Sequence, residues 1–282
     1  MAMLWLLRSS GSIETASNRV SLPESGRKGF LSFPLASRPF LWYNVKVEKV
    51  IIMKLTDTSL SILKNFSGIN PNLYVNPGNV IKTRSQKQEL AVKATIDVNF
   101  PVEFGIFDMG QFLSSIALVE NAELEFSERS VEISGDGTRL KYNYSDKNAL
   151  CIFETEVKMP EAKLEFTLKA ADLDRLKSAA SVLGHDDITF INVDGNLTAR
   201  VDTVTSMNKN VASNTFDIDL GVDAGTADFC YVVKLGQLVM LPGDYTIKFA
   251  SPSKTTHLAE FSSQQHELQY WIGLQRESYY ND

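Results

Sequence analysis

The sequence predicts an α+β fold in which one module is built twice, and three observations carry this prediction. First, Phe107–Val119 has a candidate N-cap in Asp108, and its apolar residues recur at helical spacing on one face. Second, Lys234–Leu241 repeats the pattern, with LGQL at 235–238 echoing MGQF at 109–112. Third, three short alternating segments follow each stretch. The recurrence indicates an internal duplication, with two helices packed on antiparallel sheets in each half.

Composition and charge narrow the classes of protein that fit. A chain of 282 residues with 44% hydrophobic content can bury a core, and its length favours two domains. The net charge is −6, but residues 1–52 hold seven Lys/Arg and three Asp/Glu, which leaves −10 on the rest. A polyanion partner must therefore meet a local basic surface on an acidic body. The two cysteines, Cys151 and Cys230, are too few for a disulfide framework or a structural zinc site.

Residues 1–52 differ from the rest of the chain. The apolar start, Met1–Leu7, stops at Arg8, and the residues after it have neither helical nor strand periodicity. We expect a disordered leader, and we hypothesise that Met53 is the true start, with residues 1–52 being translated upstream DNA. The expected organisation is therefore a leader at 1–52, a first domain at 53–160 and a second at 161–282. No apolar run approaches the ~20 residues needed to span a bilayer.

In the first half, a helix is expected from Asp57 or Thr58 through Phe66, ended by the GINP sequence at 68–71. The Asp136-Gly137 pair is a hairpin turn between the last two predicted strands. The strands predicted by alternation are Asn79–Arg84, Glu89–Val98, Val102–Phe107, Glu123–Phe126, Ser130–Ser134 and Thr138–Tyr144.

The linker Asn148–Ala162 joins the halves, and the cycle then restarts with a strand at Lys163–Leu168 and a helix at Ala170–Leu183. This helix shares an L-x-x-L-K pattern, at 173–177, with the first helix at 60–64. The strands after this helix are expected at Ile188–Val193, Leu197–Val204, Thr215–Val222, Phe229–Val233, Asp244–Ala250, His257–Ser262 and Leu268–Leu274.

No constellation of catalytic residues emerges from the sequence, which favours a non-enzymatic protein without cofactor or metal. The histidines His185, His257 and His266 are far apart and have no spaced partners, so we interpret them as exposed and solvated. The acidic tract Asp217–Asp223 suggests calcium, but strand alternation explains it better. No glycine-rich phosphate loop follows a predicted strand.

The remaining signal is a set of basic residues on predicted helix faces. On charge alone, an ordinary solvated face explains them, and Asp174 among them supports that interpretation. The duplicated architecture and the acidic remainder instead favour a surface that meets a polyanion. These basic residues are Lys64, Lys169, Arg175, Lys177 and Lys234, with Lys82 and Arg84 added from the first half, and the resemblance described next makes them the candidate DNA-facing residues.

From Met53 to its end, about 230 residues, the chain resembles the sliding clamps of T-even-type tailed bacteriophages, the polymerase processivity factors. Residues 1–52 have no counterpart in that family. The resemblance rests on Ile62–Phe66, Phe107–Val119, Lys169–Leu173, Leu241–Tyr245 and Ala259–Ser263.

The resemblance implies the DNA-clamp fold and a homotrimeric ring of six similar domains, with helices lining the hole. Such a ring would encircle duplex DNA without reading its sequence, be loaded by an ATP-driven clamp loader, and tether the replicative polymerase through that enzyme's C-terminal peptide. It would act in the cytoplasm of an infected bacterial host, away from membranes. The resemblance also places a peptide pocket near the join of the two domains. By position we assign it Leu150, Ile152, Phe153 and Val157, for which a buried-core role is the alternative.

Two other functions stay open on the sequence alone. A β-rich structural or accessory protein of a virion would assemble with capsids and would not stimulate a polymerase. An enzyme with a cleft between its domains would need convergent polar groups with shifted pKa values, and the sequence offers none. A role in phage late transcription, which some relatives have, is also open.

Overall fold

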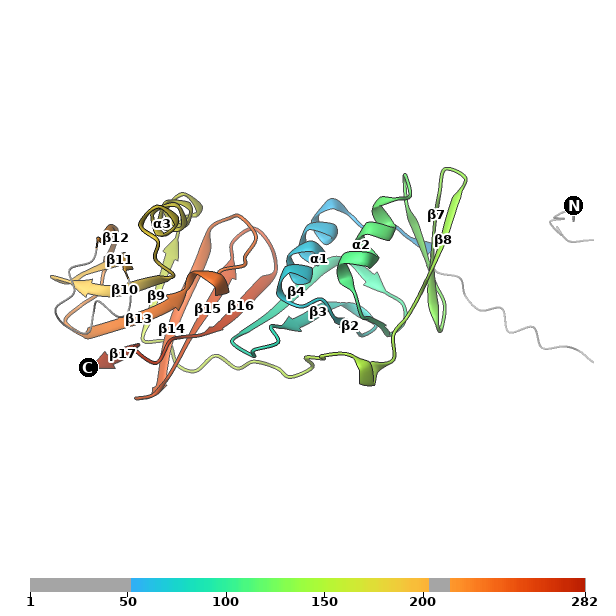
Figure 1. Cartoon of the computed structure of the whole chain (residues 1–282). Coiled ribbons are helices and arrows are strands. Elements are labelled where there is room, and N and C mark those ends of the chain that lie inside the picture. Colours follow the sequence, from blue (N-terminus) through green and yellow to red (C-terminus); the bar gives the residue numbers. More distant parts are fainter. Residues whose placement is uncertain (1–51, 203–213, 282) are drawn as a thin grey trace, which may run out of the picture. The chain divides into compact units, whose positions relative to one another are not determined.

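The computed structural model describes residues 52–202 and 214–281, all within one compact unit that begins at Glu48 (Figure 1). The leader predicted at 1–52 therefore lies outside the described residues, except for Ile52. Ile52 and Met53 form strand β1, which pairs with residues 124 and 125 of strand β6. The predicted boundary between leader and first domain thus falls inside a strand.

The first half contains two helices, as expected. Helix α1 (Asp57–Ile69) begins at Thr56, whose hydroxyl accepts a hydrogen bond of 3.1 Å from the backbone N–H of Ser59. Helix α2 (Met109–Ala117) begins at Asp108. A single 3₁₀ turn, η1 (Lys147–Ala149), precedes the linker. The strands are β1 (Ile52–Met53), β2 (Leu73–Val75), β3 (Gly78–Arg84), β4 (Leu90–Phe100), β5 (Phe104–Ile106), β6 (Glu123–Phe126), β7 (Ser130–Gly135) and β8 (Thr138–Asn143).

The second half contains helix α3 (Ala170–Leu183) and a 3₁₀ turn, η2 (Leu235–Gln237). Its strands are β9 (Leu164–Leu168), β10 (Asp187–Val193), β11 (Asn196–Asp202), β12 (Phe216–Asp223), β13 (Asp228–Lys234), β14 (Tyr245–Ser253), β15 (Thr256–Ser263), β16 (Leu268–Gly273) and β17 (Tyr279–Asn281). The predicted strands are confirmed within a few residues at their ends, although Val204, the predicted end of β11, lies outside the described residues.

One antiparallel sheet runs through both halves, in the strand order β3-β4-β16-β15-β14-β9. The halves meet where β4 pairs with β16, with Leu90 opposite Ile272 and Ala94 opposite Leu268. The first half adds the sheet β1-β6-β7-β8 and the pair β2-β5, and the second half adds β12-β11-β10-β13-β17. The two halves are therefore connected by the hydrogen bonds of one shared sheet as well as by the linker.

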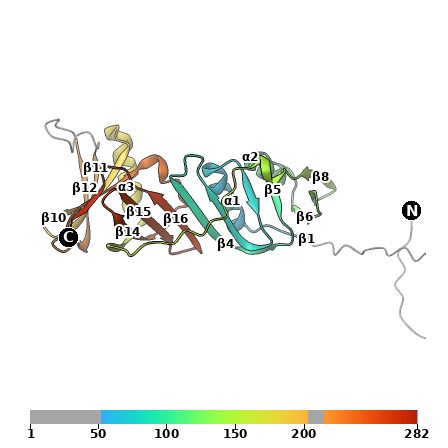
Figure 2. The same cartoon turned by 90° about the horizontal axis from the view of Figure 1, so that it is seen from below.

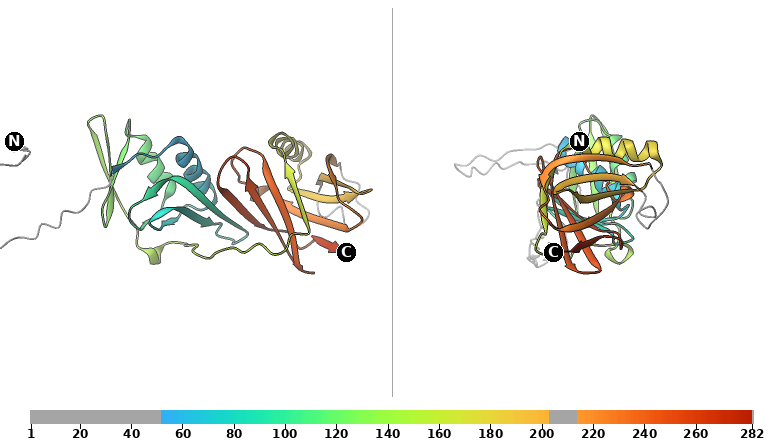
Figure 3. Two further views of the ribbon diagram at one scale, coloured as in Figure 1. Left: turned by 180° about the vertical axis from the view of Figure 1, so that it is seen from behind. Right: turned by 90° about the vertical axis from the view of Figure 1, so that its left-hand side faces the viewer.

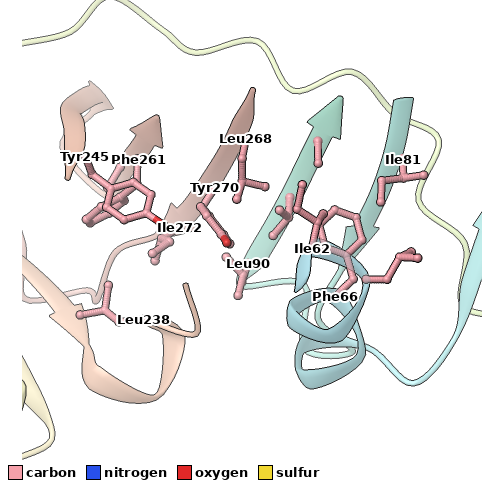
Figure 4. Packing of buried hydrophobic residues seen from close by; sticks show 14 of the residues in the cluster. Ile62, Phe66, Ile81, Leu90, Leu238, Tyr245, Phe261, Leu268, Tyr270 and Ile272 are labelled. Atoms are coloured by element: carbon pink, nitrogen blue, oxygen red, sulfur yellow. The ribbon is translucent and has the colours of Figure 1, made fainter. Parts of the chain in front are cut away.

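The core lies between the helices and one face of these sheets (Figure 4). Ile62 and Phe66 of α1 pack toward Ile81 of β3. In the second half, Tyr270 and its neighbours of the β14–β16 sheet are fully buried, and Leu238 lies on the side of the sheet to which they point. Burial of such side chains stabilises the fold by about 1.5–3 kcal/mol each.

The three helices lie on one side of this unit, as the views in Figures 1 and 3 agree. Helix α1 packs on β3 and β4 and against α2, and α3 packs on β10, β11 and β12. We call this the helix-bearing side. The opposite face of the six-stranded sheet, over which the linker runs, is called the outer face (Figure 2). None of the helices in residues 52–202 and 214–281 is long and apolar enough to cross a membrane.

The helix predicted at Lys234–Leu241 is wrong, because only the 3₁₀ turn η2 forms there. Both this stretch and α2 carry glycine at the second position, which weakens a helix by about 1 kcal/mol relative to alanine. In α2 the side chain of Asp108 compensates by accepting a hydrogen bond of 2.9 Å from the N–H of Gln111. Lys234, at the matching position, makes no capping hydrogen bond. Pro242 and Gly243 then prevent the short segment from extending.

Candidate nucleic-acid interface

Two of the predicted DNA-facing residues lie on or beside helices with little else around them. Lys64 is exposed on α1, on the side of the helix away from the buried Ile62 and Phe66. Lys169 is exposed at the N-cap position of α3 and makes no capping hydrogen bond. Asp244 takes over the cap there, because its carboxylate accepts a hydrogen bond of 2.8 Å from the N–H of Ala170.

The two cations on α3 are partly engaged by neighbours. Arg175 is exposed, lies 3.4 Å from the carboxylate of Asp172 and stacks 5.9 Å from the centre of the Phe216 ring. Lys177 is half-buried and donates a hydrogen bond of 3.1 Å to the carbonyl of Leu238. Burial lowers the pKa of Lys177, and the nearby carboxylate of Asp174 opposes that shift.

The segment after η2 brings these cations together. The side-chain amide of Asn65 on α1 donates a hydrogen bond of 3.2 Å to the carbonyl of Val239, next to the carbonyl that Lys177 binds. Lys234 is exposed at the start of η2. Lys64 on α1 and Lys177 on α3 therefore belong to one helix-bearing side, contributed by both halves of the chain.

This side is not a dense basic patch. Asp57 is exposed in the first turn of α1, and Asp172 and Asp174 lie on α3. The exposed positions of α2, by contrast, carry no charged residue. Well-separated cations among neutral and acidic groups suit weak attraction to phosphates better than a tight grip on any one phosphate.

The structure does not place Lys82 and Arg84 with the other five residues. Strand alternation turns the buried Ile81 and Thr83 of β3 toward α1, and so turns Lys82 and Arg84 to the outer face. There the ammonium group of Lys82 pairs with the carboxylate of Glu156 in the linker. The guanidinium of Arg84 lies 5.8 Å from the centre of the Phe153 ring.

The residues that we assigned to a peptide pocket help to hold the linker. Leu150, Ile152, Phe153 and Val157 are all half-buried in a segment without helix or strand. The side chain of Leu150 packs against Gly105, where even an added methyl group would come within 2.6 Å of it. These contacts agree with the alternative of a packing role.

A cavity that the sequence did not indicate lies at the join of the two halves. It has a volume of about 430 Å³ and is lined by the end of α1, the β3–β4 turn and η2, including Ile69, Lys87, Glu89, Lys234 and Gln237. Gln237 is 7% exposed, and its side-chain oxygen has no hydrogen-bond partner among the described residues. In the sequence, only the LGQL repeat at 235–238 drew attention to a segment that lines this cavity, and we interpreted that repeat as part of a helix.

Two edge strands have opposite charges. Strand β8 ends its sheet and carries exposed Arg139 and Lys141, whereas β12 ends another sheet and carries exposed Asp217 and Asp219. Helix α2 next to β8 ends in Leu118, whose side chain is 74% exposed. Beside β12, an apolar groove of about 540 Å³ lies between Ala179, Val182 and Leu183 of α3 and Phe216 at the start of β12.

The histidines show no shared site. His257 is buried, not exposed as expected, since strand alternation turns it into the core, where its ring nitrogen Nδ1 lies 2.9 Å from the hydroxyl of Ser251. His185 hydrogen-bonds through Nε2 to the carbonyl of Asn214 at 2.7 Å. Within the described part of the chain, no group of three or more His, Cys, Asp or Glu residues could hold a metal ion.

Two family models match this chain, one in each half. Residues 55–152 match the family described as DNA polymerase processivity factor, and residues 165–275 match the gp45 sliding clamp, C terminal. The sliding clamp of Vibrio phage KVP40 is 33% identical over 199 residues, which cover 69% of this chain and 89% of that protein. The sliding clamp of Escherichia phage RB69 is 24% identical over 232 residues, 80% of this chain and 98% of the relative.

Solved structures with little sequence identity share the fold. Proliferating cell nuclear antigen (PCNA) from Thermococcus kodakaraensis superposes with a TM-score of 0.58 at 15% identity, covering 80% of this chain and 99% of the other. PCNA from A. fulgidus, solved with the C-terminal region of FEN-1 bound, gives a TM-score of 0.54 at 12% identity, covering 80% and 96%. The duplicated α+β architecture predicted from the sequence is thus the fold of DNA clamps.

Proposed function

Since this chain belongs to the sliding clamps, the DNA polymerase processivity factors, we propose that three copies of it close into a ring around duplex DNA. The hold on DNA is topological, so the role requires no catalysis. The ring tethers the replicative polymerase, and an ATP-driven loader places it on DNA. Lys64, Lys169, Arg175, Lys177 and Lys234 face the DNA from the helix-bearing side, whereas Lys82 and Arg84, engaged on the outer face, are left out of the set.

The observation that carries this proposal is the pair of oppositely charged edge strands. An unpaired edge invites another strand, and β8 of one copy can extend the sheet at β12 of the next. Arg139 and Lys141 would then approach Asp217 and Asp219, and the exposed Leu118 beside β8 would reach the apolar groove beside β12. Because the two surfaces differ, the contact is head-to-tail and closes into a ring when the rotation suits.

Light scattering and electron microscopy test the ring. At micromolar concentration the protein should have the mass of a trimer and appear as a ring. Lys141→Glu should weaken the association, and Asp219→Lys added to it should restore part of the loss, whereas Lys254→Glu, in the β14–β15 turn, should have no effect. A stable monomer or a two-fold dimer would contradict the proposal.

We place the polymerase peptide in the cavity at the join of the halves. A clamp of the same fold binds the C-terminal region of a partner, as the A. fulgidus structure shows for that protein. In this chain the unpartnered oxygen of Gln237 can accept a hydrogen bond from a peptide N–H, while Lys87 can attract a carboxylate and Ile69 an apolar side chain.

Fluorescence anisotropy with the C-terminal peptide of the cognate polymerase discriminates this cavity from the linker residues. Gln237→Leu keeps the volume but removes the acceptor, and should weaken binding about tenfold. Phe153→Ala and Leu150→Ala should leave binding within about twofold of the original. If Phe153→Ala and Leu150→Ala weaken binding strongly and Gln237→Leu does not, the peptide site is instead at Leu150, Ile152, Phe153 and Val157.

The virion structural protein considered from the sequence is not favoured, because the chain belongs to the sliding clamps. It predicts that the protein co-purifies with capsids and gives no stimulation of polymerase processivity. A role in late transcription would require further protein partners, and only the resemblance to the family suggests such a role.

A further inference from the structure

A carboxylate of the linker sits between two facing lysines on the outer face of the six-stranded sheet. Lys82 on β3 and Lys93 on β4 are directly opposite each other in the strand register. Glu156 pairs with Lys82 through one carboxylate oxygen, and its other oxygen lies 3.7 Å from the ammonium group of Lys93. Like charges directly opposite on neighbouring strands repel, so Glu156 neutralises an otherwise unfavourable pair.

The chain after Glu156 must cross the middle of the sheet. At its far end, the N–H of Lys163 donates a hydrogen bond of 2.7 Å to the carbonyl of Phe249 on β14. Strands β16, β15 and β14 lie between β4 and β9, which begins directly after Lys163, and this makes a distance of about 19 Å at ~4.8 Å per strand. The seven residue steps from Glu156 to Lys163 span at most ~25 Å, so this segment has little slack and passes over the strands between β4 and β9.

The side chains under this crossing are covered although they point away from the core. On β16, Tyr270 and Ile272 are core residues, so Trp271 points to the outer face, where it is only 6% exposed. On β15, Glu260 is likewise turned outward and is 8% exposed. The indole N–H of Trp271 donates a hydrogen bond of 2.8 Å to the carboxylate of Glu260.

The linker supplies the cover. Val157, Met159, Pro160 and Ala162 are half-buried, whereas Lys158 and Glu161 are exposed. This pattern is that of a segment with one side on the sheet and the other in water. Figure 2 shows the linker crossing the outer face between the two halves.

Besides Glu156, Glu154 pairs with Lys147 at 2.7 Å and Phe153 packs on Arg84 in the first half of the segment. At the near end, the N–H of Cys151 donates a hydrogen bond of 3.1 Å to the side chain of Asn72, and Lys163 anchors the far end. Residues 151–162 between them form no helix or strand, so lifting them breaks no ladder of backbone hydrogen bonds. The Glu156 side chain is 61% exposed and therefore open to competition from dissolved ions.

We propose that residues 152–162 form a strap that opens from the outer face, with Glu156 between Lys82 and Lys93 as its latch. Opening exposes Trp271 and Glu260 to water and frees the two facing ammonium groups. The latch responds to ionic strength, because its three charges lie at the surface and a Debye length of about 8 Å at physiological salt shortens further as salt rises. The lowered pKa of Glu156, caused by the Lys82 and Lys93 ammonium groups, agrees with this geometry.

The test follows strap opening by two readouts in the full chain. Trp271 becomes the single tryptophan when Trp5 and Trp42, which lie outside the described residues, are changed to Phe. Acrylamide quenching of its emission then reports exposure of the indole. Trypsin cleavage after Lys158, followed by mass spectrometry, reports the open population when opening is fast relative to cleavage.

Glu156→Gln should increase both the quenching and the cleavage rate about two- to fivefold, the range expected for losing surface ion pairs. Glu161→Gln removes the same charge from an exposed position of the strap and should change neither. Lys93→Gln added to Glu156→Gln should change the rates little further, because the partners act as one unit.

Salt supplies the decisive comparison. The rates for the unmodified strap and for Glu161→Gln should rise with KCl toward those of Glu156→Gln, while the rates of Glu156→Gln itself should change little with KCl. The proposal is overturned if Glu156→Gln, folded as judged by circular dichroism, matches the unmodified strap in both readouts, or if both respond equally to salt.

Discussion

The hydroxyl of Tyr270 on β16 donates a hydrogen bond of 2.8 Å to the side-chain oxygen of Asn65 on α1, across 205 positions of sequence. The Asn65 amide in turn binds the carbonyl of Val239, and the N–H of Leu241 donates to the Tyr270 hydroxyl at 3.2 Å. One half-buried side chain of the first half thus holds the sheet and the post-η2 segment of the second half.

Asn65→Ala should lower the free energy of unfolding by about 1–3 kcal/mol, because it leaves the buried Tyr270 hydroxyl without its acceptor. Urea denaturation measures the change. Asn99→Ala, outside the buried positions of β4, is the matched control and should stay within about 0.5 kcal/mol of the original protein. Equal stability of the Asn65 and Asn99 variants would show that this bridge contributes nothing.

The same tyrosine predicts a loss of stability at alkaline pH. Burial raises the pKa of Tyr270 to about 12, above its ordinary value of 10.0. Between these two values the unfolded chain loses the proton first, so the stabilisation is complete below about pH 10 and is lost as the pH rises toward 12. The free energy of unfolding in urea should therefore fall between about pH 10 and about pH 12.

Tyr270→Phe tests the assignment of that pH dependence. The variant should be less stable at neutral pH but should show a shallower decline above about pH 10. Part of the decline should persist in the variant, because the pKa values of Tyr74 and Tyr279 are also raised to about 12. An unchanged slope in the variant would show that Tyr270 does not cause the decline.

Capping explains why one of two similar stretches is a helix, and it can be tested by one pair of variants. Asp108→Ala should lower stability by about 1 kcal/mol, because the side chain accepts the hydrogen bond that starts α2. Lys234→Ala, at the matching position of η2, should cost little, since Lys234 makes no capping bond. Similar losses from both in thermal unfolding would contradict this explanation.

Much of the fold could be predicted because periodicity and turn residues are local. Asp136-Gly137 and Asp194-Gly195 both adopt positive φ, as tight hairpin turns require, and the strands around them are where alternation predicted. The short strands β1, β2 and β17 have two or three residues each, too few to show alternation. Lys234–Leu241 had the right apolar spacing but lacked a cap.

The candidate surfaces were harder to predict, because sequence spacing does not report which face of a sheet a residue occupies. Lys64 and Lys177 are on helices whose buried apolar side could be recognised from the sequence. Their position on the helix-bearing side could therefore be predicted. Lys82 is turned to the outer face by the register of β3 and is engaged by Glu156, 74 positions away. The cavity around Gln237 depends on three segments that meet only in the fold.

The proposed DNA-facing cations should act together. Changing Lys64, Lys169, Arg175, Lys177 and Lys234 to Ala should weaken loading and processive synthesis while the trimer still forms. Removing one phosphate contact should lower the salt slope of DNA binding by roughly 0.9. Single changes should have small effects, because the ring repeats every residue. Arg129 and Lys254, exposed in strand turns, are the control pair. Full processivity of the fivefold variant, or equal harm from the control pair, would contradict this assignment.

The most direct test of a topological hold is retention on circular DNA. The protein is loaded onto a nicked plasmid by the cognate loader and then washed at about 1 M salt, where the Debye length falls to about 3 Å and phosphate attraction is screened. A closed ring should stay on the circle through the wash and leave when a restriction enzyme cuts the plasmid. Loss from the intact circle, or retention on the cut plasmid, would show that the chain does not encircle DNA.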